Sequence, residues 1–332
     1  MNRDLINKVL YYGTLAPSAH NTQPWKFKTN KESIVLSKDS NRVLGYSDTN
    51  GWETILSLGA CLTNLVESSK ALGLFSELKL FPNGKEDSVI AEIFLTDSAS
   101  RVDEETLEII ESRQTNRANY QKKEVSKTLI KRWIEKAQNY STTLIPISES
   151  SLINQISELH KEATEIAFAD PKFRKELSGW VRNSLTKKHD GMPGYSTNIP
   201  FPASFIGPWL IKNVNIGKMQ GSMEKAAILS SPLLIILLAK VTNTEEVLSV
   251  GRVFEEIALD ITREDLVYAP LGALIEAPEV SKDFKRILRT EETPLMLIRV
   301  GYSDKKYKRS PKELWWKLLV SNFLKNFFLF DI

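Results

Sequence analysis

Ala16-Pro17-Ser18-Ala19-His20-Asn21-Thr22-Gln23-Pro24-Trp25 is the loop from which the fold of this chain is predicted. It follows an apolar, helix-like pattern over residues 5–15 and precedes a strand-like pattern over 25–29. The two prolines fix their own φ angles and restrict the residues before them, so the loop is stiff. Ser18, Asn21 and Gln23 supply small hydrogen-bond donors and acceptors. They either face a flat polar ligand or cap the turn by bonding to nearby backbone.

The composition narrows the class of protein. The 332 residues, 42% hydrophobic and 26% charged, suffice for one large core or two smaller ones. A net charge of only +3 argues against a nucleic-acid partner. Cys61 is the only cysteine, so neither an internal disulfide nor a zinc cluster is expected, and its apolar neighbours predict burial. His160 and His189 are too far apart in the sequence to indicate a metal site.

The apolar segments predict a cytoplasmic protein. The chain begins with a charged amphipathic pattern and shows no signal-peptide core. Its longest apolar run, 232–239, has the length of a strand and is too short to span a bilayer. The segment 314–330 is aromatic-rich, and we expect a terminal helix that docks on the body of the protein or on a second subunit. Attachment to a membrane surface is the alternative for this segment.

Two segments of the chain match at a constant offset. Residues 57–74 align with 249–266, which places Gly59 on Gly251, an offset of 192 (251 − 59). Both read as helices that carry a glycine where a neighbouring backbone could approach closely. Strand-like runs follow each helix, at 89–95 and 294–300.

The repetition predicts an α+β fold, duplicated inside one chain. We expect a first half over 1–110 and a second half over 111–332, packed about a pseudo-twofold axis. A weaker echo pairs 4–10 with 128–134. The region 150–230 has no counterpart in the first half and contains the turn-forming sequences at 190–194 and 200–202. It is either a lid over a site or a surface excursion.

The opening loop, read as A-P-S-x-x-N-x-Q-P-W, resembles the flavin-contacting loop of the nitroreductase superfamily, whose members bind FMN. The stretch Arg113-Gln-Thr-Asn-Arg117 resembles the second signature of that superfamily, R-x-S/T-x-R/K. In ordinary homodimeric members both signatures lie in each chain. Here each occurs once, in different halves, so the resemblance implies one composite FMN site at the internal interface. Leu44-Gly-Tyr-Ser-Asp48 and Asp190-Gly-Met-Pro193 are similar to the Acg-like subgroup, in which two fused units carry a lid over the flavin.

The resemblance also implies roles for the arginine motif. Arg113 and Thr115 would meet the phosphate and the ribityl chain of FMN, with Asn116 in the same motif. Arg117 would approach N1 and O2 of the ring, where a cation stabilises the reduced flavin. Arg309-Ser-Pro311 resembles the C-terminal R-x-P that reaches the phosphate. Many relatives carry a second cation two residues earlier, where this chain has Tyr307, so the phosphate site would either be weaker or draw on Lys308.

A third motif, Tyr268-Ala-Pro-Leu-Gly-Ala273, resembles the loop whose backbone N–H groups face N5 of the flavin. Pro270, Leu271 and Gly272 occupy those positions. The family often has an acidic residue where Gly272 stands, so one side chain is missing. No side chain is expected to react directly, and Arg117 and Gly272 would tune the flavin.

These resemblances imply an FMN-dependent oxidoreductase with a nitroreductase-like fold, an antiparallel sheet flanked by helices. It would take two electrons from NADPH or NADH and pass them to an electron-poor small molecule, a nitroaromatic or a quinone. The alternative is an FMN-binding protein for storage, sequestration or redox sensing, with its lid closed over the flavin. As a pseudo-dimer the chain would act as a monomer, or it would pair through its C-terminal helix.

Overall fold

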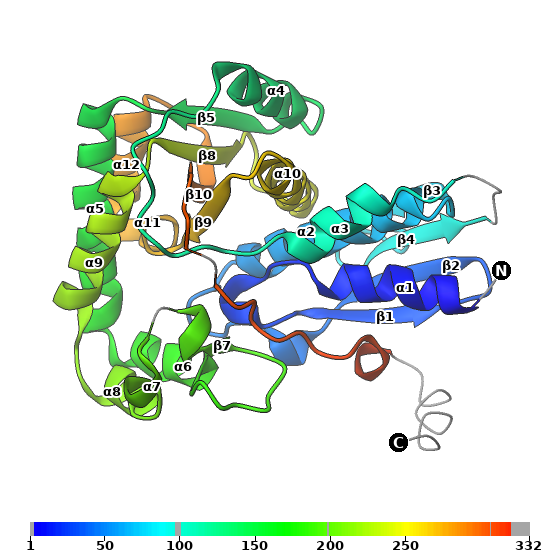
Figure 1. The fold of residues 1–332 in the computed structure, drawn as a ribbon, viewed down its shortest axis with the longest axis horizontal. Coiled ribbons are helices and arrows are strands. Elements are labelled where there is room, and N and C mark those ends of the chain that lie inside the picture. Colours follow the sequence, from blue (N-terminus) through cyan, green and yellow to red (C-terminus); the bar gives the residue numbers. More distant parts are fainter. Residues whose placement is uncertain (1–2, 97–100, 198, 306, 320–332) are drawn as a thin grey trace.

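The computed structural model describes residues 3–96, 101–197, 199–305 and 307–319. Its framework is a pair of four-stranded antiparallel sheets flanked by helices, which confirms the α+β class (Figure 1). In spatial order the first sheet contains β1 (Trp25–Thr29), β2 (Ser33–Lys38), β4 (Val89–Leu95) and β3 (Phe75–Leu80). In the same order the second contains β5 (Thr143–Ile147), β8 (Leu233–Ala239), β10 (Thr293–Gly301) and β9 (Val267–Leu271).

The two sheets have the same topology. In each sheet, the chain forms two strands, then a long helix, then two more strands. The fourth strand lies beside the second, and the third strand lies at the edge of the sheet. The long helices are α2 (Trp52–Ala71) and α10 (Thr244–Arg263), and their starts and ends differ by 192 residues (244 − 52 and 263 − 71). α1 (Arg3–Thr14) precedes the first sheet and α4 (Lys127–Gln138) precedes the second. The offset found in the sequence therefore also relates the helix bounds.

Both long helices begin five residues before the segments 57–74 and 249–266 that were predicted as helices (57 − 52 and 249 − 244). The reason is the capping chemistry upstream. Asp48 accepts the backbone N–H groups of Glu53 and Thr54 at the start of α2. Asn243 accepts the N–H of Glu246 at the start of α10. These caps satisfy donors that the first turn leaves without helical partners, and so extend each helix upstream.

α2 and α10 cross at their two glycines. A Cβ on Gly59 would meet the Leu248 carbonyl oxygen and lie 2.8 Å from the Arg252 nitrogen. A Cβ on Gly251 would meet the Leu56 carbonyl oxygen and lie 2.7 Å from the Leu56 Cα. The close backbone approach predicted at these positions is confirmed, and each glycine admits the backbone of the other helix.

The insertion supplies a layer of the core. α5 (Ser150–Ala169) and α9 (Gly217–Ser230) pack against each other and cover one face of the second sheet, together with α11 (Ala273–Glu276) and α12 (Pro278–Leu288). The main core lies on the other face of that sheet, among α2, α10 and the first sheet. Because both faces are covered, every residue of β8 is buried. The helices of the insertion are thus part of the scaffold, and only its middle remains available to cover a site.

The middle of the insertion lies at one end of the molecule. α6 (Pro171–Trp180), β6 (Val181–Arg182), β7 (Met192–Pro193), α7 (Phe201–Ser204) and α8 (Gly207–Asn213) occupy the lower part of Figure 1. α3 (Glu104–Ser112) packs on α2 and α10. The short 3₁₀ helices are η1 (Ala19–Asn21), η2 (Ser40–Arg42), η3 (Gly194–Ser196) and η4 (Trp315–Leu318).

The C-terminal helix predicted over 314–330 lies largely outside the described residues. Within them, η4 is a short 3₁₀ helix, and Leu319 bridges to Phe27 of β1. Cys61 is buried, as predicted. Among the helices of the described residues, none is both long and apolar enough to cross a membrane.

Candidate functional site

A pocket lies where the opening loop, the arginine motif and the C-terminal segment meet. It is a hollow of about 530 Å³ that includes open solvent, and about 80 Å³ of it is enclosed enough to hold water-sized groups. Six predicted site residues line it: Ser18, Asn21, Arg113, Thr115, Arg117 and Arg309. The remaining lining residues are Pro17, His20, Gln114, Met192, Ser196, Lys308, Ser310 and Lys312. Folding thus brings together motifs that are nearly 300 residues apart (309 − 18 = 291).

Arg113 forms a fixed wall of the pocket. It follows the last residue of α3 and is only 3% exposed. Its Nε lies 3.0 Å from a carboxylate oxygen of Glu255, on α10. One Nη donates to the Tyr268 hydroxyl at 2.6 Å, and the other donates to the Leu15 carbonyl at 2.8 Å. Its guanidinium is therefore held by the protein and contributes a fixed positive charge.

Two further cations come from the C-terminal segment. Arg309 donates to the Ile110 carbonyl at 3.1 Å and to two further carbonyls at the end of α3. A cation is favourable there, because the C-terminal end of a helix carries partial negative charge. Lys312 donates to the Ala16 carbonyl at 2.6 Å and to Asn21 Oδ1 at 3.0 Å. The segment is therefore tied to both α3 and the opening loop.

The charges around the pocket do not balance. Burial raises the pKa of the Glu255 carboxyl to about 7, against the opposing effect of Arg113. Burial, and then the Arg113 charge, lower the pKa of Arg309 to about 10. The same two causes lower the pKa of Lys312 well below its ordinary value. Three basic side chains therefore crowd one buried carboxyl group, and an anion such as a phosphate would offset the repulsion that lowers the pKa values of Arg309 and Lys312.

The opening loop holds an unusual backbone. His20, Asn21 and Gln23 all have positive φ, at 48°, 57° and 55°. Residues other than glycine adopt this region rarely, although asparagine tolerates it better than most. The Ser18 hydroxyl accepts the N–H of Gln23 at 3.0 Å. Ser18 therefore caps the turn, as one of the two readings expected, and it also lines the pocket; its contact with a ligand stays a prediction.

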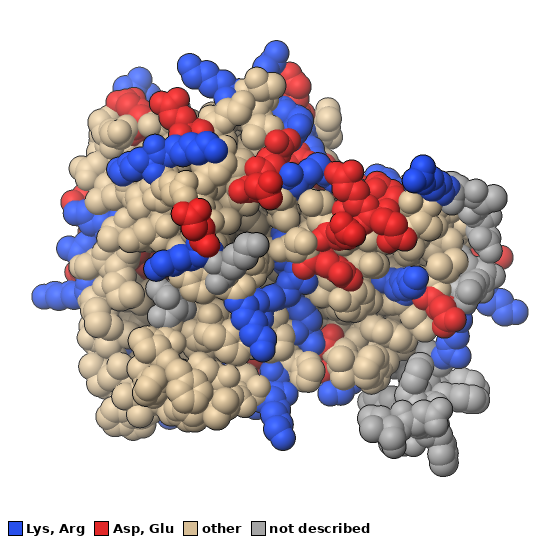
Figure 2. Space-filling view, viewed as in Figure 1, with Lys and Arg blue, Asp and Glu red and all other residues tan. Residues whose placement is uncertain are grey.

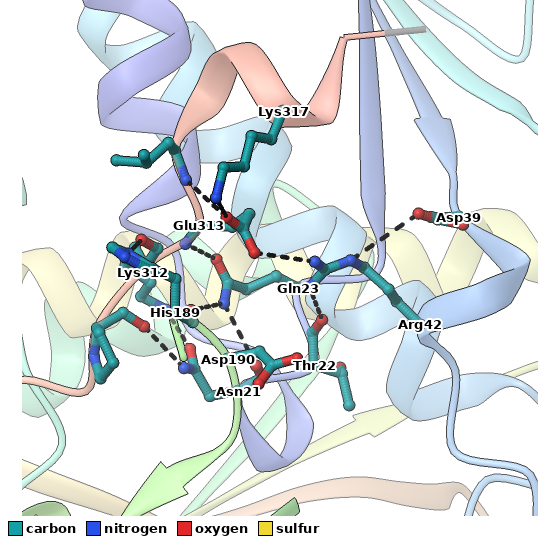
Figure 3. A network of polar contacts seen from close by, with 12 residues as sticks. Asn21, Thr22, Gln23, Asp39, Arg42, His189, Asp190, Lys312, Glu313 and Lys317 are labelled. Atoms are coloured by element: carbon teal, nitrogen blue, oxygen red, sulfur yellow. Dashed lines mark hydrogen bonds and ion pairs between the residues drawn. The ribbon is translucent and has the colours of Figure 1, made fainter. Parts of the chain in front are cut away.

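The amides of the opening loop contact the insertion and the C-terminal segment (Figure 3). Asn21 Nδ2 donates to the Gly191 carbonyl at 3.0 Å and to the Pro311 carbonyl at 2.9 Å. Gln23 Nε2 donates to the His189 carbonyl at 2.8 Å, and its Oε1 accepts the Glu313 N–H at 2.8 Å. Gln23 is fully buried and does not line the pocket.

Arg117 also contacts the insertion. Its Nη1 donates to the Ser196 carbonyl at 2.8 Å. Three of the side chains assigned to the flavin therefore donate to backbone carbonyls of residues 189–196, which we call the cover segment. This segment packs on the first loop through its main chain.

Besides Gln23, four predicted site residues lie away from the pocket lining. Asn116 is buried and donates to the Lys305 carbonyl at 2.7 Å. Pro270 and Leu271 belong to β9, and Gly272 is the residue before α11. Thr115, which does line the pocket, forms a bridge with Tyr268 of β9 and so joins the two motifs. The roles assigned to these residues stay predictions.

A pair of carboxyl groups adjoins Gly272. A Cβ at this position would collide with Glu276 Oε1 and lie 3.8 Å from Glu53 Oε1. Burial, and then the charge of Glu276, raise the pKa of the Glu53 carboxyl. Burial likewise raises the pKa of the Glu276 carboxyl. The family often has an acidic residue where this chain has Gly272, and Glu276 places a carboxyl group beside that position.

Three residues at or near the site were not predicted from the sequence: Glu255, Glu276 and Lys312. Glu255 had a visible signal, since it interrupts the apolar face of α10 with a charge. Lys312 lies three residues after Arg309 in a basic segment. Glu276 had no such signal in the sequence, because only the fold brings it close to Glu53. In the described part of the chain, no three or more His, Cys, Asp or Glu residues gather as metal ligands.

Among the residues that the structure describes, the fold and the site define a two-sheet α+β protein with a cationic pocket where the opening loop, the arginine motif and the C-terminal segment meet. No model of a known protein family matches the chain. It is similar to a Mycobacterium tuberculosis H37Rv protein curated under the provisional name NAD(P)H nitroreductase acg. The two are 22% identical over 318 residues, which span 93% of this chain and 92% of that protein. The expected similarity to Acg-like proteins is thereby confirmed over nearly the whole length.

Other similarities are shorter or weaker. A second H37Rv protein, provisionally named NAD(P)H nitroreductase Rv3131, is 33% identical over 90 residues, 27% of this chain and 26% of that one. The FMN-dependent nitroreductase NfnB from Mycobacterium smegmatis, solved with NADPH, superposes on 60% of this chain and 89% of its own, with 17% identity and a TM-score of 0.39. Iodotyrosine deiodinase bound to FMN and 3-iodo-L-tyrosine covers 63% of this chain and 95% of its own, with 12% identity and a TM-score of 0.40.

Proposed function

We propose that this protein is an FMN-dependent oxidoreductase of the nitroreductase type. It takes two electrons from NADPH or NADH and passes them to an electron-poor small molecule, a nitroaromatic or a quinone. The observation that carries the proposal is the group of three cations around one buried carboxylate at the junction of the predicted motifs. The names of the full-length curated relatives support it.

The pocket fits the phosphate end of FMN. Arg309 and Lys312, with Lys308 at the rim, would hold the phosphate, and the fixed charge of Arg113 would add to the field. Ser18, Asn21 and Arg117 would face the remainder of the cofactor. FMN, when bound, supplies the two-electron chemistry, and the protein contributes position and electrostatics.

The site is composite in this proposal. Residues 1–110 and 111–332 are diverged copies, and the pocket takes its loop from the first and its arginine motif from the second. The common strand order and the constant offset of 192 residues support this duplication (251 − 59). One FMN would then bind to each chain.

A second candidate function follows from the cover segment. Asn21, Gln23 and Arg117 all donate to its carbonyls. If these bonds persist with FMN bound, the ring is shielded from reductant and acceptor. The protein would then store, sequester or sense the flavin.

One spectroscopic experiment separates the two functions. The purified protein is loaded with FMN, and its absorption spectrum is recorded without oxygen before and after NADPH or NADH is added. Bleaching of the flavin band within seconds supports the oxidoreductase. A band that persists with both nicotinamides but bleaches with dithionite supports the closed flavoprotein. Failure to bind FMN contradicts both.

The phosphate assignment has its own test. The affinities of the protein for FMN and for riboflavin are compared in Lys312→Gln and in the control Lys79→Gln, whose lysine is exposed on β3. We expect Lys312→Gln to lose about tenfold in FMN affinity, since hydrogen bonds to a charged group contribute about 1.5–3 kcal/mol. Its riboflavin affinity should not change. Equal affinities of the unaltered protein for FMN and riboflavin would show that the pocket does not bind the phosphate group.

A further inference from the structure

Large apolar side chains are exposed in one part of the insertion. The described part of the chain has 13 large hydrophobic residues with much of their surface exposed, and eight of them lie between 185 and 223. We call six of these the insertion patch: Phe201, Phe205, Ile206, Trp209, Met219 and Met223. Each is at least half exposed, and Trp209 reaches 65%. A concentration of this kind marks a binding surface.

The patch is built by short, well-packed elements. Gly207 and Ile211 bury one side of α8, which leaves Trp209 facing outward. The rings of Phe201 and Phe205 pack edge to face, with centroids 5.4 Å apart. Met219 and Met223 lie one turn apart on α9, on the same helical face. The exposure therefore belongs to ordered helices.

The charged side chains within the stretch that carries the patch have one sign. Residues 191–223 contain no Asp or Glu, whereas Lys212 and Lys218 lie among them. Lys187 and Lys188 precede the patch, and all four lysines are exposed. None of the four has an ion-pair partner among residues that the structure describes. Figure 2 shows a broad uncharged face where Figure 1 places α7 and α8, with blue side chains at its edge.

We infer that the insertion patch docks on an anionic lipid surface. Aromatic and aliphatic side chains on short helices enter the boundary between headgroups and acyl chains, and flanking lysines bind anionic headgroups. A symmetric contact with a second copy fits less well. It would bring the same lysines together, because both partners use the same surface, and the patch offers no carboxylates to pair with them. This inference does not depend on the proposed function.

Vesicle sedimentation with the full chain tests the inference. Vesicles of phosphatidylcholine alone are compared with vesicles that also contain phosphatidylglycerol. In parallel, the molar mass of the protein without vesicles is measured by light scattering, which gives its oligomeric state. We expect binding to the anionic vesicles only, weakened by salt. The double variant Ile206→Ser/Trp209→Ser should lose at least about tenfold in affinity, because it removes the most exposed apolar surface. The control Val241→Ser removes a residue 58% exposed outside the patch and should change nothing.

The lysines are tested separately. Lys212→Gln and Lys218→Gln should each weaken binding to anionic vesicles about fivefold, the effect expected for one lysine near a charged membrane. Three results would overturn the inference: no binding to either vesicle, equal binding to both, or equal loss in the Val241→Ser control. A dimer that Ile206→Ser/Trp209→Ser converts to a monomer, without vesicle binding, would assign the patch to a second copy instead.

Discussion

Arg113 and Glu255 form an ion pair almost completely shielded from water, with side chains 3% and 0% exposed. A buried charge that loses its partner is costly, because neither water nor another group replaces the lost interaction. Here the cost is greater, since Arg309 and Lys312 add positive charge nearby. The carboxylate therefore offsets positive charge at the point where the pocket accumulates basic groups, while its burial raises its pKa.

We expect the effect of Glu255→Gln on the free energy of unfolding to depend on pH. The pKa of the Glu255 carboxyl is raised to about 7 in the folded protein, so its ionisation costs stability as pH rises through that value, and the variant should gain on the unaltered protein between pH 5 and pH 8. Added inorganic phosphate should stabilise the variant more than the unaltered protein, because the variant leaves the nearby cations without a carboxylate. The control is Glu245→Gln on the same helix, whose carboxylate pairs with Lys85 at the exposed surface and whose loss should change stability by less than about 1 kcal/mol. Urea denaturation at both pH values, with and without phosphate, measures these effects, and a stability difference that does not vary with pH would contradict the raised pKa.

The carboxyl groups of Glu53 and Glu276 make stability depend on pH. Their pKa values are raised in the folded protein by burial, and Asp48, Glu176 and Glu224 add negative charge, while His160 opposes it for Glu276. The folded state therefore holds protons that the unfolded chain has released above its ordinary carboxyl pKa. Stability from this pair is highest at low pH and falls as pH rises through the folded values.

Glu276→Gln should therefore be more stable than the unaltered protein at pH 8, by about 1.4 kcal/mol for each unit by which the pKa is raised. The difference should shrink toward pH 4. Denaturation midpoints measured across this range test the prediction, with Glu279→Gln as an exposed control on the neighbouring helix. A constant difference between variant and unaltered protein at all pH values would contradict it.

At the scale of elements, the crossing of α2 and α10 depends on two glycines. We expect Gly59→Ala to destabilise the protein by about 1–3 kcal/mol, because the new Cβ meets backbone atoms that cannot rotate away. Gly251→Ala should behave in the same way, since its Cβ meets the backbone of Leu56. The matched control is Gly179→Ala in α6, where nothing lies within 4 Å of the added Cβ.

Thermal and urea unfolding of the three variants measure this effect. Gly179→Ala should be neutral or more stable by up to about 1 kcal/mol, since alanine favours the helix. If Gly59→Ala and Gly179→Ala had the same stability, the close contact between the helices would be wrong.

At the scale of the whole molecule, α2 is buried between the two sheets. Fifteen of its 20 residues are buried, including Cys61 at 0% exposure. Burial also raises the pKa of the Cys61 thiol. Access to this thiol therefore requires that the packing around α2 opens or that the whole chain unfolds.

We expect Cys61 to react with a thiol reagent only as the protein unfolds. The urea midpoint for labelling should coincide with the midpoint for loss of helix by circular dichroism, as in a single cooperative transition. Val241→Cys adds an exposed thiol and should react at once in the folded protein. Labelling of Cys61 at lower urea than loss of helix would mean that the packing around α2 opens first.

The sequence by itself determined the local elements and the identity of several pocket residues. The strands at 25–29 and 89–95 were predicted with the bounds that the structure has, since alternation and flanking turns act over a few residues. The resemblance of the opening loop and of the arginine motif to the nitroreductase signatures nominated Arg113, Thr115 and Arg117 among residues that do line one pocket.

Only the tertiary structure decided the partners of these residues. Glu255 reaches Arg113 across 142 positions (255 − 113), and the amides of Asn21 and Gln23 bond to a segment more than 160 positions away (189 − 23 = 166). The insertion, undecided between lid and excursion, divides into core helices and a cover segment because the second sheet has a second face to bury. Burial and charge balance depend on the packing of distant segments, and local sequence patterns carry no record of it.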